Sequence, residues 1–247
     1  MYIARIPLDQ KGAVVETQNQ WSVAKMENAN AEANSQEADA QLHQAQNDHK
    51  AARLSVDSAI SAKKSAEQSA DMNRINNAQK DLKAAEDSSK AAEMRVKYFE
   101  AYRNYLRRYM RYTQENMYWY EAKYEVAKSS LAQRNNIAIK NVDYNKFPQQ
   151  VEQRGARTQK AKERAEAEKS KALQARQAWL SAQQAADKLT GRTGSMFDPM
   201  APPAQPTTAG GGGGAAIQSN VQQGEVKPLS NTPAPTTGGG DAPQQNQ

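Results

Sequence analysis

The sequence predicts an all-α protein, an elongated antiparallel coiled coil of three long helices followed by a disordered C-terminal tail. Good helix formers dominate residues 13–190, which contain only one glycine and one proline. Apolar residues recur there in alternating steps of three and four, the spacing of a coiled-coil seam. Residues 191–247 hold eleven of the thirteen glycines and eight of the ten prolines. This last segment offers little to bury, so we expect it to be a flexible tail.

The first predicted helix covers residues 13–70 and carries a narrow seam of small side chains. An alanine occurs at every seventh position through most of this segment: Ala24, Ala31, Ala38, Ala45, Ala52, Ala59 and Ala66. Small side chains let two helices approach closely but remove little area from water. The seam therefore needs a partner helix with larger side chains.

Two further helices are predicted over residues 75–136 and 149–190. Their seams run from Ile75 to Leu131 and from Val151 to Leu189. The segment between them is rich in asparagine and ends at Pro148, which disfavours helix before it and suits the first turn of a new helix. Residues 1–12 precede the first seam and are expected to form an extended N-terminal segment.

The connection near residues 71–77 leaves two topologies open. Asparagines concentrate there, and asparagine tolerates the left-handed conformation that ends helices. Because no glycine or proline enforces a turn, the first two helices could also form one continuous rod. Folding back is favoured because it avoids the entropic cost of associating with another chain. It would bring Trp21 close to Tyr120 and Tyr124.

Residues 98–124 contain eight of the chain's ten tyrosines. Two neighbouring stripes at helical spacing make this face wide, as expected for a middle helix buried on two sides. Burial of large side chains contributes more to stability than an exposed ion pair, which adds only about 0.2–1 kcal/mol. We therefore expect a packing face here. Its members are Tyr98, Phe99, Tyr102, Tyr105, Leu106, Tyr109, Met110, Met117, Tyr120 and Tyr124.

Charge is distributed unevenly along the helices. Residues 13–70 carry five Lys/Arg and eight Asp/Glu, whereas residues 95–113 carry six Lys/Arg and one Asp/Glu. This pattern predicts that the acidic first helix lies beside the basic second helix.

The same basic stretch supports a second interpretation, in which Arg103, Arg107, Arg108 and Arg111 contact an anionic partner. Arginine and tyrosine planes can stack on the bases of single-stranded nucleic acid, and a basic helix with aromatic residues can also lie on a membrane surface. Polysaccharides and lipid headgroups are further anionic partners. No motif of sequence-specific nucleic-acid recognition is present.

The sequence does not indicate an enzyme. His43 and His49 lie six residues apart, which is not the spacing of a helical metal pair, and the chain has no cysteine. The five glycines at 210–214 lack the Lys-Ser/Thr ending of a phosphate-binding loop. We therefore predict no catalytic residues, no metal or cofactor site and no small-molecule substrate.

The alanine-rich helices, the segment AKYEVAKSSLAQRNNIA at 122–138 and the Pro/Gly/Gln/Thr tail resemble helical envelope proteins, often lipoproteins, of Gram-negative bacteria. The resemblance covers residues 75–190. It implies a periplasmic location on the outer membrane, through an N-terminal lipid-bearing cysteine that this chain does not show. Without a signal peptide, the literal prediction is cytoplasmic. The abrupt start of the chain leads us to expect a precursor that begins further upstream.

Together these observations predict a non-enzymatic scaffold or spacer of the cell envelope that acts through protein–protein contacts. Association into a homo-oligomer is a further alternative that the sequence leaves open. The alternative is a module that binds an anionic polymer or a membrane surface through residues 95–124.

Overall fold

The computed structural model describes residues 6–137, 143–191 and 196–202, and its described part is helical, without strands. A short 3-10 helix, η2 (Leu8–Lys11), leads directly into α1 (Gly12–Gln68). The other long helices are α2 (Met72–Arg134) and α3 (Lys146–Thr190). The predicted all-α, three-helix architecture is confirmed.

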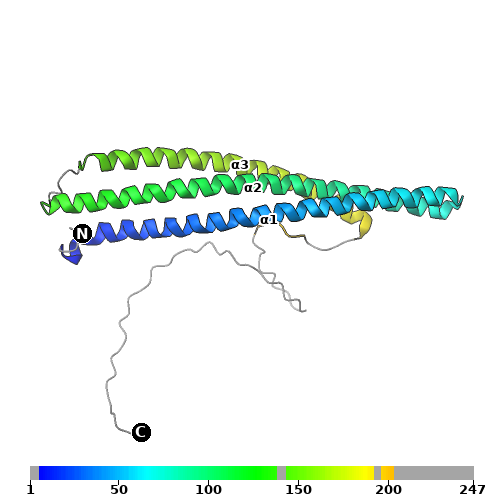
Figure 1. Cartoon of the computed structure of the whole chain (residues 1–247), viewed down its shortest axis with the longest axis horizontal. Helices are drawn as coiled ribbons and strands as arrows, with labels where there is room; N and C mark the ends of the chain where they lie inside the picture. Colours follow the sequence, from blue (N-terminus) through cyan, green and yellow to red (C-terminus); the bar gives the residue numbers. More distant parts are fainter. Residues whose placement is uncertain (1–5, 138–142, 192–195, 203–247) are drawn as a thin grey trace, which may run out of the picture. The chain divides into compact units, whose positions relative to one another are not determined.

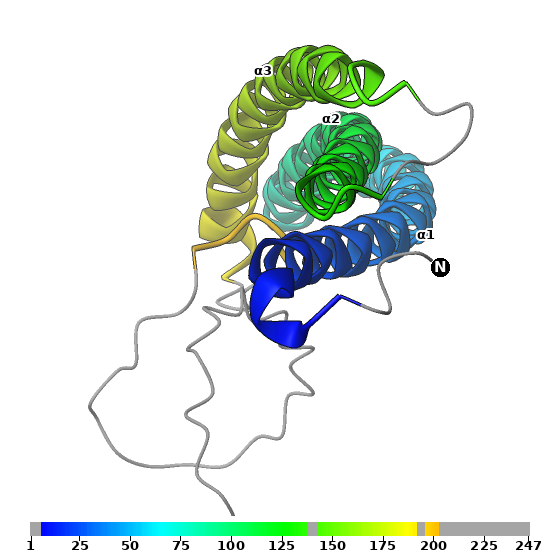
Figure 2. The ribbon, with the colours of Figure 1, turned by 90° about the vertical axis from the view of Figure 1, so that its left-hand side faces the viewer.

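The central element is α2, which packs along both α1 and α3. The end-on view shows α2 between the other two helices (Figure 2). Consecutive helices run antiparallel, so the first two segments fold back and do not form a rod (Figure 1). Trp21 of α1 stacks on Tyr124 of α2 with ring centroids 5.6 Å apart, as the fold-back topology predicts.

The heptad patterns identify the buried positions of α1 and α3. In α1, Ala24, Ala31, Ala38 and Ala45 are at most 2% exposed. In α3, every seventh residue is buried: Thr158, Ala165, Ala172, Trp179 and Ala186. Mostly small side chains at these positions let both outer helices approach the large side chains of α2 closely.

All three helices meet in one apolar cluster. Leu42 and Ala45 of α1 contact Tyr98 and Phe99 of α2 and Trp179 of α3. The rings of Tyr98 and Trp179 are stacked at 5.4 Å with an angle of 7° between their planes. Beyond this cluster α3 ends, and α1 and α2 continue as a two-helix hairpin to their turn (Figure 1).

The turn between α1 and α2 is tighter than the predicted segment 71–77. Ala70 adopts the left-handed conformation, with φ of 53°, in place of the expected asparagine. The Asp71 carboxylate then accepts hydrogen bonds from the backbone N–H groups of Asn73 and Arg74. Because this N-cap starts α2 at Met72, the asparagines of this segment lie within the helix.

A glycine provides the close approach of α3 to α2. A Cβ atom at Gly155 would lie 3.2 Å from Nε1 of Trp119. The single glycine within the predicted helical segment therefore has a packing reason.

Two predictions about the ends of the chain need correction. The extended segment expected at 1–12 does not include Leu8–Lys11 or Gly12, because these residues are already helical, and residues 1–5 lie outside the described part. The tail expected from residue 191 does not include 196–200. Met200 packs against the three-helix cluster, and the compact helical unit ends at this residue. The prediction for residues 203–247 lies outside the described residues.

Candidate functional site

Every residue of the predicted packing face is at least half-buried. Tyr98, Phe99 and Leu106 are 0%, 1% and 5% exposed. The remaining members are half-buried: Tyr102, Tyr105, Tyr109, Met110, Met117, Tyr120 and Tyr124. The face is therefore used mainly for packing between helices.

Five tyrosines form a continuous stripe along α2. Successive rings from Tyr98 through Tyr102, Tyr105 and Tyr109 to Tyr112 have centroids 5.8–6.4 Å apart. Burial raises the pKa of each of these hydroxyls, to about 12 for Tyr102. The neutral phenols are thus the stable form within the bundle.

Two hydroxyls of the stripe donate hydrogen bonds to carboxylates on other segments. Tyr109 donates to Oε1 of Glu27 on α1 at 2.9 Å, and Tyr98 donates to Oδ1 of Asp198 at 2.8 Å. These bonds raise the tyrosine pKa values further, because a nearby carboxylate disfavours the phenolate. The stripe therefore joins α2 to α1 and to the segment after α3.

The four candidate arginines do not form one common surface. Arg107 donates to Asp39 on α1 at 3.1 Å, and Arg103 lies 3.9 Å from the same carboxylate. With the Arg95–Asp48 ion pair at 2.7 Å, these contacts join the acidic α1 to the basic α2, as the charge pattern predicts. Arg103 and Arg107 thus have a role within the bundle.

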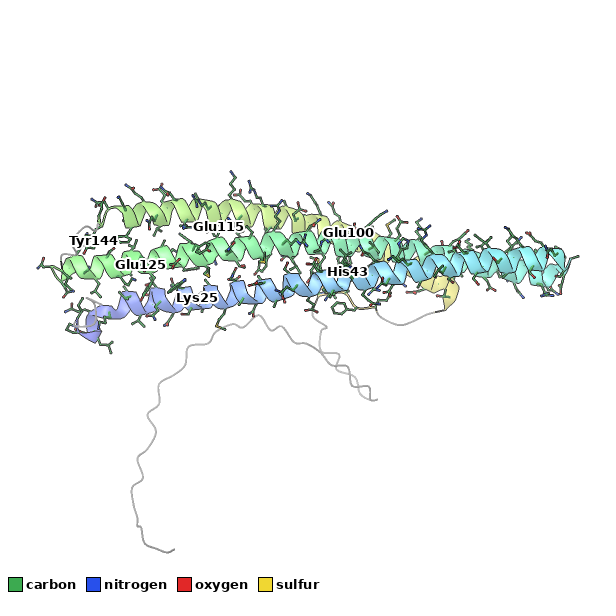
Figure 3. The ribbon with its side chains drawn as sticks, in the orientation of Figure 1. Lys25, His43, Glu100, Glu115, Glu125 and Tyr144 are labelled. Atoms are coloured by element: carbon green, nitrogen blue, oxygen red, sulfur yellow. The ribbon has the colours of Figure 1, made fainter. Side chains whose placement is uncertain are left out.

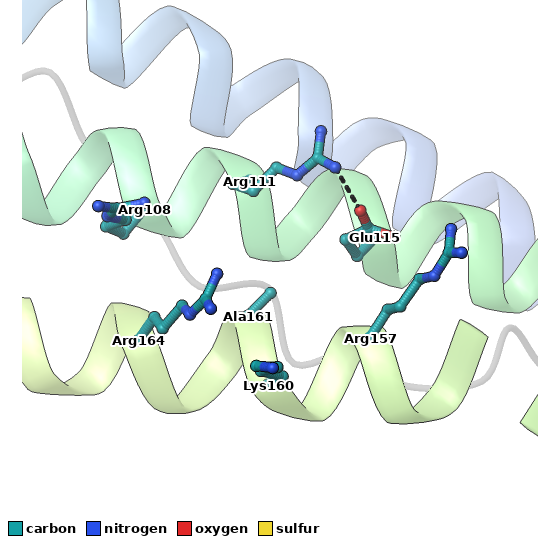
Figure 4. Close-up of a pocket in the computed structure, with 7 residues that line it drawn as sticks. All are labelled: Arg108, Arg111, Glu115, Arg157, Lys160, Ala161 and Arg164. Carbon is teal, nitrogen blue, oxygen red and sulfur yellow. Dashed lines mark hydrogen bonds and ion pairs between the residues drawn. The ribbon is translucent and has the colours of Figure 1, made fainter. Parts of the chain in front are cut away.

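Arg108 and Arg111 instead line a groove between α2 and α3. The groove has a volume of about 270 Å³. Arg157 and Arg164 extend from α3 toward α2 in the close-up view (Figure 4). The full lining consists of Arg108, Arg111, Glu115, Arg157, Lys160, Ala161 and Arg164. We call this the basic groove.

Glu115 is the one carboxylate among the lining residues, and its side chain is 8% exposed. Its Oε1 accepts a hydrogen bond from Nη2 of Arg111 at 2.6 Å. Its Oε2 has no hydrogen-bond partner among the described residues, since Nη1 of Arg154 lies 4.0 Å away. Figure 3 marks Glu115 on α2, among the charged side chains along the three helices.

The other cations of the basic groove have no acidic partner in the part of the chain that the structure describes. Within the described ranges, no carboxylate lies within 4.0 Å of the charged atoms of Arg108, Arg157, Lys160 or Arg164. A second hollow of about 240 Å³ shares Arg157 and is also lined by Gln150, Gln153 and Arg154. The basic surface thus continues toward the start of α3.

Sequence reasoning missed the α3 side of this groove. Arg157 and Arg164 are seven residues apart and so share one helix face, but glutamates interspersed in the same stretch give it the mixed charge that is typical of a solvated helix face. It also missed Asp198, which stands in a segment dominated by glycine and proline. Only Met196, Phe197 and Met200 around it signalled material that could be buried.

The described residues provide neither a metal-binding cluster nor a membrane-spanning helix. They contain no cluster of three or more His, Cys, Asp or Glu with the geometry of a metal site. None of the helices in the described ranges has the length and apolar character to span a membrane. Comparison with known proteins found no matching family model, and no significant match among curated proteins or solved structures.

Proposed function

We propose that this chain is a non-enzymatic coiled-coil scaffold or spacer of the bacterial cell envelope. The observation that carries the proposal is the use of the aromatic face of α2 at two helix interfaces. Its largest fully buried side chains, Tyr98 and Phe99, pack with Trp179 of α3 and with α1. Most of the large side chains of α2 therefore stabilise the three-helix bundle.

Length supports a mechanical role. The 63 residues of α2 extend about 95 Å at 1.5 Å per residue. The start of α3 lies at the C-terminal end of α2, and the turn from α1 lies at the other end of α2 (Figure 1). Partners attached at the two ends would be held apart by a fixed distance.

The envelope location and the protein partners rest on the sequence resemblance over residues 75–190. A periplasmic or outer-membrane-associated protein that is attached to a partner at one end would use the length of its helical bundle to reach a second partner. A homo-oligomer would serve the same purpose. Separation of periplasmic, membrane and cytoplasmic fractions, with the native chain detected by antibody, tests the location.

Changing the length of the hairpin tests the spacer role. Removing residues 55–61 and 79–85 takes one heptad from each of α1 and α2, so the seams stay in register. The hairpin of α1 and α2 then shortens by about 10 Å. We expect this variant to fold but to restore poorly the phenotype of cells that lack the native gene. The control protein keeps the native length and carries alanine substitutions at exposed positions of the same two heptads. Full restoration by the shortened chain would rule out a spacer.

The basic groove favours a second candidate function, an anion-binding module. A helix that used arginines and tyrosines together is less favoured, since the tyrosine stripe is half-buried or buried while Arg108 is exposed. Anion binding through the groove is compatible with a scaffold and can be tested separately.

A further inference from the structure

The basic groove concentrates like charges that the rest of the bundle does not neutralise. Its lining has five positive side chains and one carboxylate, a net charge of +4. At the interface of α1 and α2, by contrast, Arg95 meets Asp48 and Arg107 meets Asp39. The groove is therefore a place in the described bundle where positive charge lacks a matching negative charge.

The positions on α3 make this excess of charge unfavourable for the free protein. Lys160 lies three residues after Arg157 and four residues before Arg164, so the three cations are neighbours on one face. Like charges at these spacings destabilise a helix, and an anion between them removes the repulsion. Binding of an anion would thus reduce the repulsion between these cations, which the folded protein alone does not remove.

The lining residues indicate the chemistry of the ligand. Guanidinium groups present planar pairs of N–H donors that match phosphate oxygens. Arg108 stands on α2, whereas Arg157 and Arg164 extend from α3 toward α2, so both helices supply donors to the groove (Figure 4). No aromatic side chain is among the lining residues, so the groove lacks the aromatic platform on which single-strand-binding proteins stack successive bases.

The size of the groove favours a compact ligand over a long polymer. Arg157 and Arg164 are seven residues apart, which is about 10 Å along α3. We propose that the basic groove binds a compact ligand carrying two or more closely spaced phosphate groups. The phosphates come from a soluble oligophosphate or from a phosphorylated lipid headgroup.

Glu115 tunes this site from within. Its carboxylate holds Arg111 by the 2.6 Å hydrogen bond and adds one negative charge beside the ligand. Replacing it with glutamine removes that charge and frees Arg111 to donate to phosphate. Glu115→Gln should therefore strengthen phosphate binding, whereas loss of a groove cation should weaken it.

Calorimetric titration of the full chain with inorganic triphosphate tests the proposal. At low ionic strength, about 20 mM salt, we expect one binding site per chain. Lys160→Glu and Arg164→Glu should each weaken binding by at least about tenfold, because each removes a charged donor and adds a repulsive charge. The helical circular dichroism of each variant confirms that it is folded.

Lys162→Glu is the matched control, since it makes the same charge change two residues away on another face of α3. Lys162 is exposed and does not line the groove. It should weaken binding by less than about twofold. Equal losses in Lys160→Glu and Lys162→Glu would overturn the proposal, because binding would then follow net charge alone.

Binding to cardiolipin vesicles, compared with binding to triphosphate, distinguishes the two sources of phosphate. Cosedimentation with cardiolipin vesicles that depends on Lys160 and not on Lys162 supports the site and assigns it to a lipid headgroup. Binding of triphosphate in solution with the same dependence supports a soluble ligand. Binding of neither, or tighter binding of a single-stranded oligonucleotide that both variants weaken equally, would overturn the proposal.

Discussion

The hydroxyl of Tyr98 donates a hydrogen bond to Asp198 across 100 residues of sequence, at 2.8 Å. Asp198 also pairs with Nε of Arg176 at 2.7 Å, and its side chain is only 9% exposed. The backbone N–H of Met200 donates to the same carboxylate. One acidic side chain thus attaches the segment after α3 to the place where all three helices meet.

We expect Asp198→Ala to lower the free energy of unfolding by about 1.5–3 kcal/mol, because it leaves the Tyr98 hydroxyl and the Arg176 guanidinium without their acceptor. Urea denaturation followed by circular dichroism measures the change. Asp57→Ala, at an exposed position of α1, should change stability by less than about 0.5 kcal/mol.

A chain truncated after Pro202 should keep the native stability, whereas truncation after Gly191 should behave like Asp198→Ala. Equal stability of both truncated chains would show that the attachment contributes nothing.

Leu106 and Arg108 provide a test of the packing register. Leu106 is 5% exposed at the centre of α2, whereas Arg108 is exposed in the basic groove. Leu106→Asp buries a charge and removes a core side chain, so we expect a loss of at least about 3 kcal/mol. Arg108→Asp should change stability by less than about 1 kcal/mol. Thermal melts of the two variants measure the difference, and similar shifts would mean that the register is wrong.

Ala70 offers a stabilising substitution. Its φ of 53° costs an L-residue about 1–2 kcal/mol, which glycine does not pay, while glycine raises the entropy of the unfolded chain. We expect Ala70→Gly to be neutral or stabilising by up to about 1 kcal/mol. Ala62→Gly, at an exposed position in the middle of a helix, should instead cost about 1 kcal/mol. A loss of similar size in both variants, measured by urea denaturation, would argue against the left-handed turn.

The tyrosine stripe predicts a loss of stability in alkali. Burial raises the pKa of Tyr102 to about 12, above the unfolded value near 10. Its contribution is fully present below about pH 10 and is lost as the pH rises from about 10 toward 12, because the unfolded chain releases its proton first. The free energy of unfolding should therefore fall between about pH 10 and pH 12. Tyr102→Phe should make this fall smaller, and an equal fall in both proteins would contradict the assignment.

The fold could be predicted because its causes are periodic. Alanines at every seventh position of α1 and the apolar seam of α3 mark the contact stripes directly, and two stripes on residues 98–124 indicate a helix buried on two sides. The turn was predicted only approximately. Its sharp start depends on the Asp71 side chain reaching two backbone N–H groups, a local contact with no periodic signal.

The candidate site was harder to predict because it depends on which helix face meets which. The arginines of residues 103–111 look alike in sequence, but Asp39 neutralises Arg107 while Arg108 turns to the groove with α3. Which arginine faces α1 and which faces α3 depends on how α2 is rotated about its axis between these two helices. Asp198 was missed for a different reason, since one carboxylate that fits a distant tyrosine leaves no pattern along the chain.

The distance between the start of α1 and the end of α2 tests the central claim, that α1 folds back on α2 within one chain. The chain has no cysteine, so Glu16→Cys and Gln133→Cys provide unique spin-label positions at exposed sites. Pulsed electron paramagnetic resonance should give a distance of about 15–35 Å, because packed helices lie about 8–10 Å apart. The distance should persist when labelled protein is diluted with unlabelled protein. A continuous rod would separate the labels by about 175 Å. Absence of the short distance, or its loss on dilution, would contradict the three-helix fold and the groove built on it.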